Sequence, residues 1–478
     1  MERPKLKRRD GAVIDKARTD AFQNDFHGQV IQPGDAGYDT ARRVWNASID
    51  KHPGLIARCL GTADIAQAVK FARANDLLVA VRSGGHNVAG RALCDDGVVI
   101  DLSAMKGIFV DPQLRTLRVQ AGATLGDADR ETHMHGLAVP TGVVSKTGIA
   151  GLTLGGGVGW LVRKYGLTCD NLLSCEVVTA AGEVITANDE INADLFWGLR
   201  GGGGNFGIVS SFLYRAYPVS TVLGGVVAYP RNQAAVMLRY YRDFMSAAPD
   251  ELTAYAGLIS MPDGTPAAGV MVCYCGDLTE GERVIKPLRA VGSPVFDAIQ
   301  PMPFQIMQKL AGDLSPDGTH NYWRSTFLKK LSDEVIDLIV EHGNRMESPL
   351  SRIVLQFFGG AAGRVGRADT AFAQRQAEYN VGIETEWTDA TESEKHIGWA
   401  RTVSDALKPY SSGGYLVNFL GDEEPDAVRA AFGSNYARLV KLKTKYDPTN
   451  FFSLNQNVAP MRSERSDATS YVPCRHSS

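Results

Sequence analysis

The residues with the clearest chemical potential lie in one short glycine-rich segment, Arg82-Ser-Gly-Gly-His86-Asn87. A strand-like apolar run at 77–81 precedes it, so the segment starts where a buried strand ends. Its backbone amides, together with Arg82, can meet a phosphate group. His86 projects from the same turn and offers a ring nitrogen that can act as a nucleophile or accept a proton. A lone loop histidine is more often structural, so its role depends on its surroundings.

Those surroundings are rich in glycine. The chain has 50 glycines in 478 residues, whereas average usage gives about 33. Sixteen of the glycines lie in three stretches, 82–90, 142–159 and 198–207. Glycine allows a backbone to approach a ligand closely, and successive N–H groups in such loops bind phosphate. The clustering therefore predicts a large anionic ligand held by three loops, because simple turns at sheet edges would spread the glycines more evenly.

One glycine pattern points to a different cofactor fold but lacks the required context. Gly202-x-Gly204-x-x-Gly207 matches the dinucleotide fingerprint of Rossmann proteins. That fingerprint needs a helix directly after the last glycine, so that the helix N-terminus faces the pyrophosphate. Residues 208–214 instead alternate like a strand. We therefore interpret these glycines as part of the three-loop site and expect no Rossmann domain.

Two histidines suggest a metal site, but their spacing argues against it. His133 and His135 lie two positions apart in a segment with a helical pattern, and residues i and i+2 do not share a helix face. No third ligand lies nearby in the sequence, so we expect no metal.

Composition and charge exclude other classes of protein. Lys plus Arg is 50 and Asp plus Glu is 53, which gives a net charge of −3. A nucleic-acid-binding protein would need a basic excess. The seven cysteines form neither a CxxC pair nor a zinc spacing, which favours reduced thiols. With no signal peptide and no apolar span recognisable, we expect a cytoplasmic protein without membrane contact.

The elements that must position the glycine loops change in character near residue 217. Before it, a β-α-β pattern covers 55–82 and short strands follow, whereas 222–425 mixes strands with amphipathic helices. A final helical segment, 426–445, ends at Asp447-Pro448. We expect an α+β protein with an N-terminal extension (1–24), a first domain (25–217), an inserted second domain (218–425), a return to the first domain (426–462) and a polar tail (463–478).

The glycine segments resemble those of the vanillyl-alcohol oxidase superfamily, and more narrowly of the berberine-bridge-enzyme-like FAD-linked oxidases. The similarity runs from about residue 55 to 460. Besides the His86 segment it includes Leu152-Thr-Leu-Gly-Gly-Gly-Val-Gly159, Arg163-Lys-Tyr-Gly-Leu167, Asp194-Leu-Phe-Trp-Gly-Leu-Arg-Gly-Gly-Gly-Gly-Asn-Phe-Gly207 and Tyr446-Asp-Pro-Thr-Asn-Phe451. The resemblance implies a PCMH-type two-part FAD-binding domain and a substrate domain built on an antiparallel sheet backed by helices. Within the family the chain is most similar to bacterial members.

The resemblance also implies how FAD is held. His86 is expected to carry the flavin covalently. Many relatives add a second link from a cysteine, whose place is taken here by Val144, so we expect a single attachment. Thr147 stands where relatives control the access of oxygen. The residues expected to hold the cofactor are Arg82, Ser83, Gly84, Gly85, His86, Asn87, Thr147, Gly148, Gly151, Gly155, Gly156, Gly157, Gly159, Val209, Asn455 and Gln456.

The catalytic base of many alcohol-oxidising relatives is missing from its usual place. Those relatives use the tyrosine of an Asn-Tyr pair, whereas Asn418 is followed here by Phe419, which cannot accept a proton. Tyr322 and Tyr415 are the candidate replacements, since a strand over 414–419 would place Tyr415 and Phe419 on one face. Alternatively, a neutral amine substrate needs no base. The expected substrate pocket comprises Trp323, Arg324, Gln356 and Phe419.

The reaction implied by the resemblance is the two-electron oxidation of an alcohol, an amine or an activated C–H. Hydride passes to flavin N5, and O2 reoxidises the flavin to give hydrogen peroxide. The partners are then a small molecule and O2, with the protein a monomer or a homodimer. Three alternatives stay open: a dehydrogenase of the same family, a non-catalytic FAD-binding protein and an NAD-dependent Rossmann enzyme.

Overall fold

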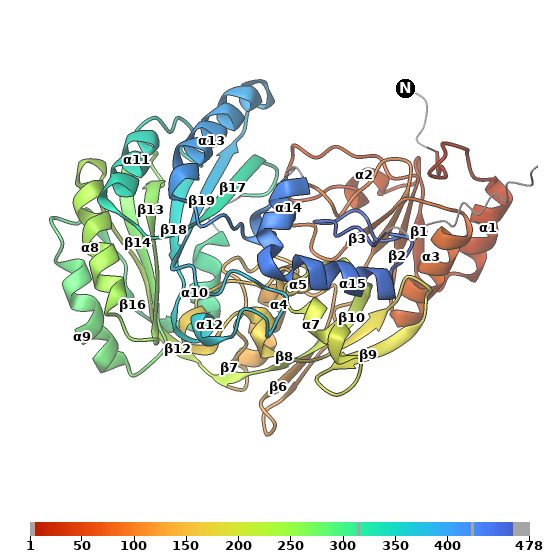
Figure 1. Cartoon of the computed structure of the whole chain (residues 1–478), viewed down its shortest axis with the longest axis horizontal. Helices are drawn as coiled ribbons and strands as arrows, with labels where there is room; N and C mark the ends of the chain where they lie inside the picture. Colours follow the sequence, from red (N-terminus) through yellow and green to blue (C-terminus); the bar gives the residue numbers. More distant parts are fainter. Residues whose placement is uncertain (1–4, 313–315, 422–424, 462–478) are drawn as a thin grey trace, which may run out of the picture.

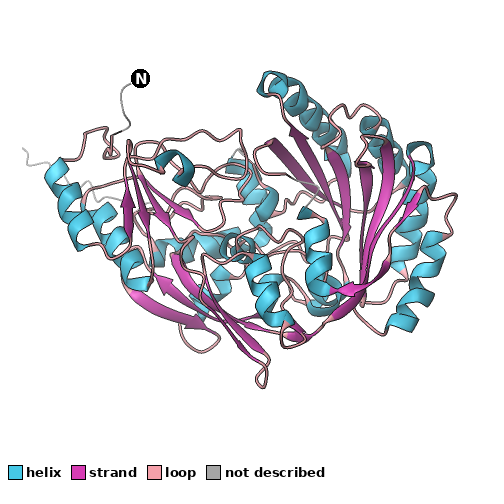
Figure 2. Cartoon of the chain, turned by 180° about the vertical axis from the view of Figure 1, so that it is seen from behind, coloured by secondary structure: helices cyan, strands magenta, loops and turns pink. Residues whose placement is uncertain are grey.

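The computed structural model describes residues 5–312, 316–421 and 425–461. The chain forms two halves that lie side by side (Figure 1). One half holds two small sheets, a separate two-stranded sheet (residues 137–138 and 217–218) and the C-terminal helices, and the other is a large sheet with helices on its outer face (Figure 2). This arrangement matches the expected α+β class.

The first small sheet confirms the predicted β-α-β unit. Its strand order is β1-β2-β4-β3, with β2 and β3 both parallel to β4. The connecting helix α3 begins at Thr62 with Gly61 as its N-cap, one residue earlier than expected, because the Thr62 hydroxyl donates to Glu176. The elements are α1 (Lys16–Asp25), β1 (Gln29–Ile31), α2 (Tyr38–Ala41), β2 (Leu55–Arg58), α3 (Thr62–Ala74), β3 (Val79–Arg82) and β4 (Val98–Asp101).

The second small sheet has the order β5-β6-β10-β8-β9. Strand β10 begins directly after Gly207, so no helix follows the Rossmann-like fingerprint and its rejection is confirmed. The elements are β5 (Ile108–Asp111), β6 (Thr116–Gln120), α4 (Leu125–His133), β7 (Leu137–Ala138), α5 (Ile149–Leu154), α6 (Val162–Tyr165), β8 (Leu172–Val178), β9 (Val184–Asn188), α7 (Ala193–Leu199), β10 (Ile208–Arg215) and β11 (Tyr217–Pro218).

The large sheet is antiparallel, with the order β15-β12-β14-β13-β18-β19-β17, and β16 also pairs with β12. Helices α8, α11 and α13 share a hydrophobic core with one face of this sheet, which leaves the other face toward the first half. The elements are β12 (Thr221–Pro230), α8 (Ala234–Ser246), β13 (Leu252–Ser260), β14 (Pro266–Tyr274), α9 (Leu278–Arg289), β15 (Phe296–Asp297), β16 (Gln300–Pro303), α10 (Phe304–Leu310), β17 (His320–Leu328), α11 (Asp333–Gly343), β18 (Arg352–Phe357), α12 (Gly360–Arg364), β19 (Tyr379–Trp387) and α13 (Ser393–Leu407).

The C-terminal segment returns to the first half (Figure 1). Helices α14 (Pro425–Phe432) and α15 (Tyr436–Tyr446) contribute to the core of the small sheets. A 3₁₀ turn at Gly433–Asn435 separates them, where the sequence predicted one continuous helix. The predicted strand over 414–419 is wrong: Val417–Phe419 is a 3₁₀ turn.

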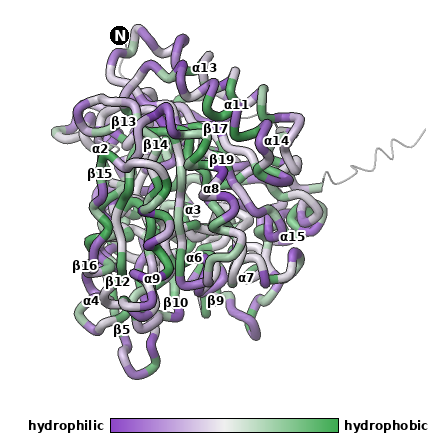
Figure 3. The backbone as a smooth tube through the Cα atoms, turned by 90° about the vertical axis from the view of Figure 1, so that its left-hand side faces the viewer, coloured by the Kyte–Doolittle hydropathy of each residue, from purple (hydrophilic) through white to green (hydrophobic). Residues whose placement is uncertain are grey.

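Hydrophobic residues follow the strands in the interior, and hydrophilic residues mark the outer loops (Figure 3). In the part of the chain described, each helix is too short or too polar to cross a bilayer. Six cysteines there are buried and free of disulfides, and Cys474 lies outside the described residues.

Candidate functional site

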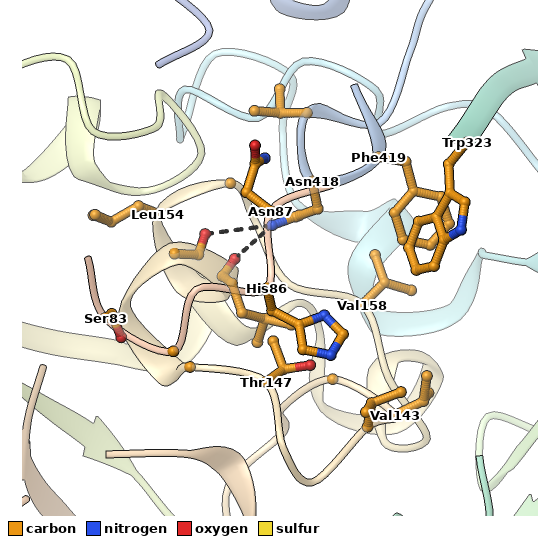
Figure 4. Close-up of a pocket in the computed structure, with 18 of the residues that line it drawn as sticks. Ser83, His86, Asn87, Val143, Thr147, Leu154, Val158, Trp323, Asn418 and Phe419 are labelled. Atoms are coloured by element: carbon orange, nitrogen blue, oxygen red, sulfur yellow. Dashed lines mark hydrogen bonds between the residues drawn. The ribbon is translucent and has the colours of Figure 1, made fainter. Parts of the chain in front are cut away.

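A cavity of about 380 Å³ lies between the glycine-rich loops and the large sheet. One wall is backbone-rich and comes from the loops around Gly84, Gly148, Gly203 and Asn455. The opposite wall consists of residues on the helix-free face of β12, β13, β14, β17, β18 and β19. Figure 4 shows His86, Thr147 and Asn418 on the first side, with Trp323 and Phe419 across the space.

Two of the glycine loops pack backbone against backbone. A Cβ atom at Gly84 would lie under 3.0 Å from the backbone of Gly148, and one at Gly148 would lie equally close to that of Gly84. No side chain fits at either position, which is why both are glycine. The Ser83 hydroxyl donates to the Ala121 carbonyl at 2.6 Å and anchors the first loop. The two loops therefore approach each other closely.

His86 is held as a neutral imidazole at the cavity. Its ring stacks on Trp45, with centroids 4.3 Å apart and an angle of 12°. Burial lowers the pKa of His86 to about 4, so its ring is uncharged near neutral pH. Its Nε2 atom is buried and has no hydrogen-bond partner among the described residues. An orphaned buried nitrogen beside a cavity fits a ring that bonds to a cofactor.

Most of the predicted cofactor residues line the cavity, and four do not. Arg82 donates to the Ala41 carbonyl. Gly156 packs under Phe372, and Gly157 packs against Thr168. Gly159 packs against the Thr141 carbonyl. For these four residues the predicted cofactor contact is corrected, because they lie behind the loop wall and pack against other parts of the chain. Those on the wall are Ser83, Gly84, Gly85, His86, Asn87, Thr147, Gly148, Gly151, Gly155, Val209, Asn455 and Gln456.

Asn418 connects the C-terminal segment to the loop wall and was missed as a site residue. Its Nδ2 donates to the Leu152 carbonyl at 3.1 Å (Figure 4). Its Oδ1 accepts from the Gly157 amide at 3.3 Å. A Cβ at Gly155 would collide with the Asn418 amide. Asn418 therefore fixes the conformation of the Gly-Gly-Gly segment. The sequence did contain a signal for Asn418, because it is the asparagine of the Asn-Tyr motif in which Phe419 replaces the tyrosine.

Neither tyrosine proposed as a base lines the cavity. Tyr322 packs on the helix side of the large sheet, and its hydroxyl accepts from Arg324 at 2.9 Å and from Arg401 at 3.3 Å. Because side chains alternate along β17, Trp323 faces the cavity while Tyr322 and Arg324 face away. Tyr415 packs against the core of the small sheets. The placements of Tyr322, Tyr415 and Arg324 in the pocket were wrong, whereas Trp323, Gln356 and Phe419 do line it.

The sheet wall contains a charged pair that the sequence reasoning missed. Glu384 lines the cavity, and its Oε2 accepts from Arg352 Nε at 2.5 Å. Glu384 is the register partner of both Trp323 and Arg352. The side chain of Glu384 is 9% exposed and that of Arg352 is 14% exposed. The signal for Glu384 was an acidic residue within the segment 379–387, which forms a fully buried strand, because buried carboxylates are rare.

The neutral imidazole, the close-packed glycine loops and the largely apolar cavity fit the adenine dinucleotide and flavin of FAD. The comparisons with known proteins agree with this fit. A family model described as FAD binding domain matches residues 53–188. A second, described as berberine and berberine like, matches residues 416–459.

Relatives align over almost the whole chain. An FAD-linked oxidoreductase of Dictyostelium discoideum is 33% identical over 446 residues, covering 92% of this chain and 96% of the relative. The (R)-6-hydroxynicotine oxidase of Paenarthrobacter nicotinovorans is 33% identical over 450 residues, covering 91% and 97%. The crystal structure of 6-hydroxy-D-nicotine oxidase from Arthrobacter nicotinovorans superposes with a TM-score of 0.85 at 32% identity, covering 91% and 99%. The chain belongs to the berberine-bridge-enzyme-like family of FAD-linked oxidoreductases and has the PCMH-type FAD-binding fold.

Proposed function

We propose that this enzyme oxidises an alcohol, an amine or an activated C–H of a small, largely apolar molecule and passes the electrons to O2, with FAD attached covalently to His86. The single observation that carries the proposal is that Glu384, a buried carboxylate, lines the same cavity as His86. A proton acceptor on one wall and a cofactor-binding histidine on the other are the parts that such an oxidation needs.

Glu384 takes the role that we first gave to a tyrosine. Arg352 binds Oε2, so the carboxylate is held in place and its other oxygen, Oε1, can receive a proton from a substrate O–H or N–H. The absence of a side chain at Gly382 keeps the space beside this oxygen free. A Cβ at that position would lie 3.1 Å from Oε1 and 3.4 Å from the Phe419 ring. The phenyl ring of Phe419 therefore borders the base and excludes water from it.

FAD, when bound, accepts two electrons from the substrate carbon and passes them to O2, which yields hydrogen peroxide. The residues of the chain supply binding and proton transfer. Thr147 lies on the loop wall, where we propose that it borders the path of O2. Trp323 stands edge-on to Trp45 at 5.3 Å and closes the cavity beside His86.

Two observations support attachment through His86 alone. The neutral ring leaves a nitrogen lone pair available for a bond to carbon, which a protonated ring would not. Val144 lines the cavity at the place of the second, cysteine link of some relatives and cannot form one. The free, buried cysteines support a reducing compartment, and we propose the cytoplasm, with the enzyme a monomer or a homodimer.

The sheet wall favours an aromatic or alicyclic substrate over an oligosaccharide. Val226, Met271, Ile259 and Val354 present apolar groups to the cavity, whereas a sugar would need a dense set of polar partners. One relative named above is a 6-hydroxynicotine oxidase, and this wall suits a compound of that kind, a heteroaromatic ring joined to a cyclic amine.

Anaerobic mixing of the purified holoenzyme with alcohols, phenols and cyclic amines tests the proposal. A substrate bleaches the flavin absorbance, and admission of air restores it rapidly with one H2O2 per substrate oxidised. Slow reoxidation by air with rapid reoxidation by an artificial acceptor identifies a dehydrogenase. Failure of every compound to bleach the flavin identifies a non-catalytic FAD-binding protein and overturns the proposal.

A further inference from the structure

A furrow with few side chains crosses the cavity face of the large sheet. Gly269 on β14 pairs with Gly257 on β13, which pairs with Val354 on β18, and Val354 pairs with Gly382 on β19. Gly257, Gly269 and Val354 line the cavity. Three of four neighbouring positions on this row therefore carry no side chain of their own, although the Ile259 side chain lies against Gly269. The row crosses the strands and ends at Gly382, two residues before Glu384 on β19.

The rows on either side of the furrow carry large side chains. Tyr255 pairs with Met271 on one side and with Gln356 on the other, which forms one bank. The Arg352–Glu384 pair belongs to the opposite bank. Gln356 and Arg352 are four residues apart on β18, so the two banks are separated by about 13 Å along the strand. A flat molecule of two rings is long enough to reach from one bank to the other across Val354.

The bank at Tyr255 offers hydrogen-bond donors. Trp160 lines the cavity, is 2% exposed, and its Nε1–H has no partner within the described part of the chain. Gln356 uses its Oε1 to accept from Asn380 Nδ2 at 2.9 Å, which leaves its Nε2–H2 as a donor. The Tyr255 hydroxyl is already used, because it donates to the Gly159 carbonyl at 3.0 Å.

An unpartnered donor that is almost fully buried is costly unless a ligand satisfies it. Trp160 Nε1 can only donate, so its partner must be an acceptor. The opposite bank ends in a carboxylate, Glu384, which accepts from a donor. The cavity therefore presents an acceptor at one end, donors at the other and an apolar hollow between them.

We propose that the furrow is a second subsite, which binds an extended, two-ring substrate through a carbonyl or ether oxygen between its rings that accepts from Trp160 and Gln356. This inference rests on the proposed function, in which the near end of the substrate presents its O–H or N–H to Glu384. Gly269 and Gly257 set the size of the subsite, and the two donors set its polarity.

Two phenols that differ only in the bridging group test the subsite. 4-Benzoylphenol carries a ketone between its rings, and 4-benzylphenol carries a methylene. Each is titrated into the oxidised holoenzyme under anaerobic conditions, and the dissociation constant is obtained from the perturbation of the flavin spectrum. The wild-type enzyme is expected to bind the ketone about tenfold more tightly, the value of one hydrogen bond.

Variants separate the donors from the hollow. Trp160→Phe and Gln356→Leu are each expected to reduce the ketone preference to threefold or less while binding of 4-benzylphenol stays within threefold. Gly269→Val places a Cβ 2.8 Å from the Ile259 side chain, so it displaces Ile259 and is expected to weaken both phenols at least tenfold. Tyr322→Phe, on the helix side of the sheet, is the control and leaves both constants unchanged. Flavin content and near-ultraviolet circular dichroism confirm that each variant is folded.

The proposal is overturned by equal affinities in the wild type, by absence of binding of both phenols, or by a ketone preference that survives in both donor variants. Bleaching of the flavin is recorded in a parallel screen of alcohols and amines. A ketone preference without bleaching by any compound would refute the proposed oxidation and leave the subsite standing, whereas bleaching without a preference would do the reverse.

Discussion

The two walls of the cavity bind by different means. The loop wall presents backbone, with Gly84 and Gly148 packed so closely that a Cβ atom fits at neither position. The sheet wall presents side chains drawn from six strands, among them Glu384, Arg352 and Trp323. A cofactor shared by a family needs a constant backbone cradle, whereas a substrate is selected by side chains that can change one at a time.

The largest effect is expected at the loop wall. His86→Ala removes the ring nitrogen that we propose bonds to the flavin, so the covalent attachment should be lost completely. Acid precipitation followed by absorbance of pellet and supernatant measures it: the flavin stays with the wild-type pellet and appears in the supernatant of the variant. Val144→Ala serves as the matched control and should keep its flavin in the pellet. Flavin that remains with the His86→Ala pellet would refute the histidine link.

On the sheet wall, Glu384→Gln should slow the anaerobic reduction of the flavin by about 10²- to 10⁴-fold, the usual contribution of a general base. Rapid-mixing absorbance measures the rate, and the flavin content should be unchanged because the residue lies on the other wall. Tyr322→Phe and Tyr415→Phe should remain within twofold of the wild type. A rate that is unchanged in Glu384→Gln but reduced in either tyrosine variant would reinstate the tyrosine.

A buried carboxyl group links helix α4 to helix α10 behind the loop wall. Asp129 on α4 accepts from Gln308 Nε2 of α10 at 3.2 Å, and the same amide group also donates to Thr141 and Gly142 in the loop wall. Burial raises the pKa of Asp129 to about 7. In the unfolded chain the value is about 3.9.

The folded state therefore holds the proton of Asp129 more tightly than the unfolded state does. The stability that this proton confers is complete below about pH 4 and is lost as the pH rises to about 7. Asp129→Asn removes this dependence, so the stability difference between wild type and variant should change by up to roughly 4 kcal/mol across the interval. Denaturant unfolding at pH 4.5, 6 and 7.5 measures it. Parallel pH profiles of the two proteins would show that Asp129 does not titrate in this way.

The smallest expected effect comes from replacing single glycines. It distinguishes a glycine that contacts another backbone from a glycine that contacts nothing. Gly148→Ala places a Cβ against the backbone of Gly84 and should reduce the flavin content by half or more. Gly398→Ala, in helix α13 where nothing lies within 4 Å of the new Cβ, should leave the flavin content unchanged and raise stability by up to about 1 kcal/mol. Flavin absorbance per mole of protein measures the first outcome. Equal flavin contents in the two variants would contradict the backbone cradle.

The tertiary structure corrected the sequence-based predictions mainly where a side chain's direction mattered. Tyr322 and Trp323 are adjacent in the sequence, yet they lie on opposite faces of β17, and no pattern around them revealed which face meets the cavity. Tyr415 was assigned to a strand over 414–419, but Tyr415 lies in irregular backbone just before the 3₁₀ turn Val417–Phe419. The domain limits at 217/218 and 425/426 remain predictions, although the strands of the large sheet and the return of α14 and α15 agree with them.

The sequence by itself determined the family, the cofactor and the loops that hold it. The physical reason is that a backbone cradle requires glycine at consecutive, local positions, and such positions are visible in a linear chain. Only the tertiary structure brought Glu384, Arg352, Gln356 and Trp160 to one cavity, because the register between neighbouring strands and the position of a loop decide which side chains meet. The glycine loops thus disclose what the protein binds, and the folded sheet decides what it can act on.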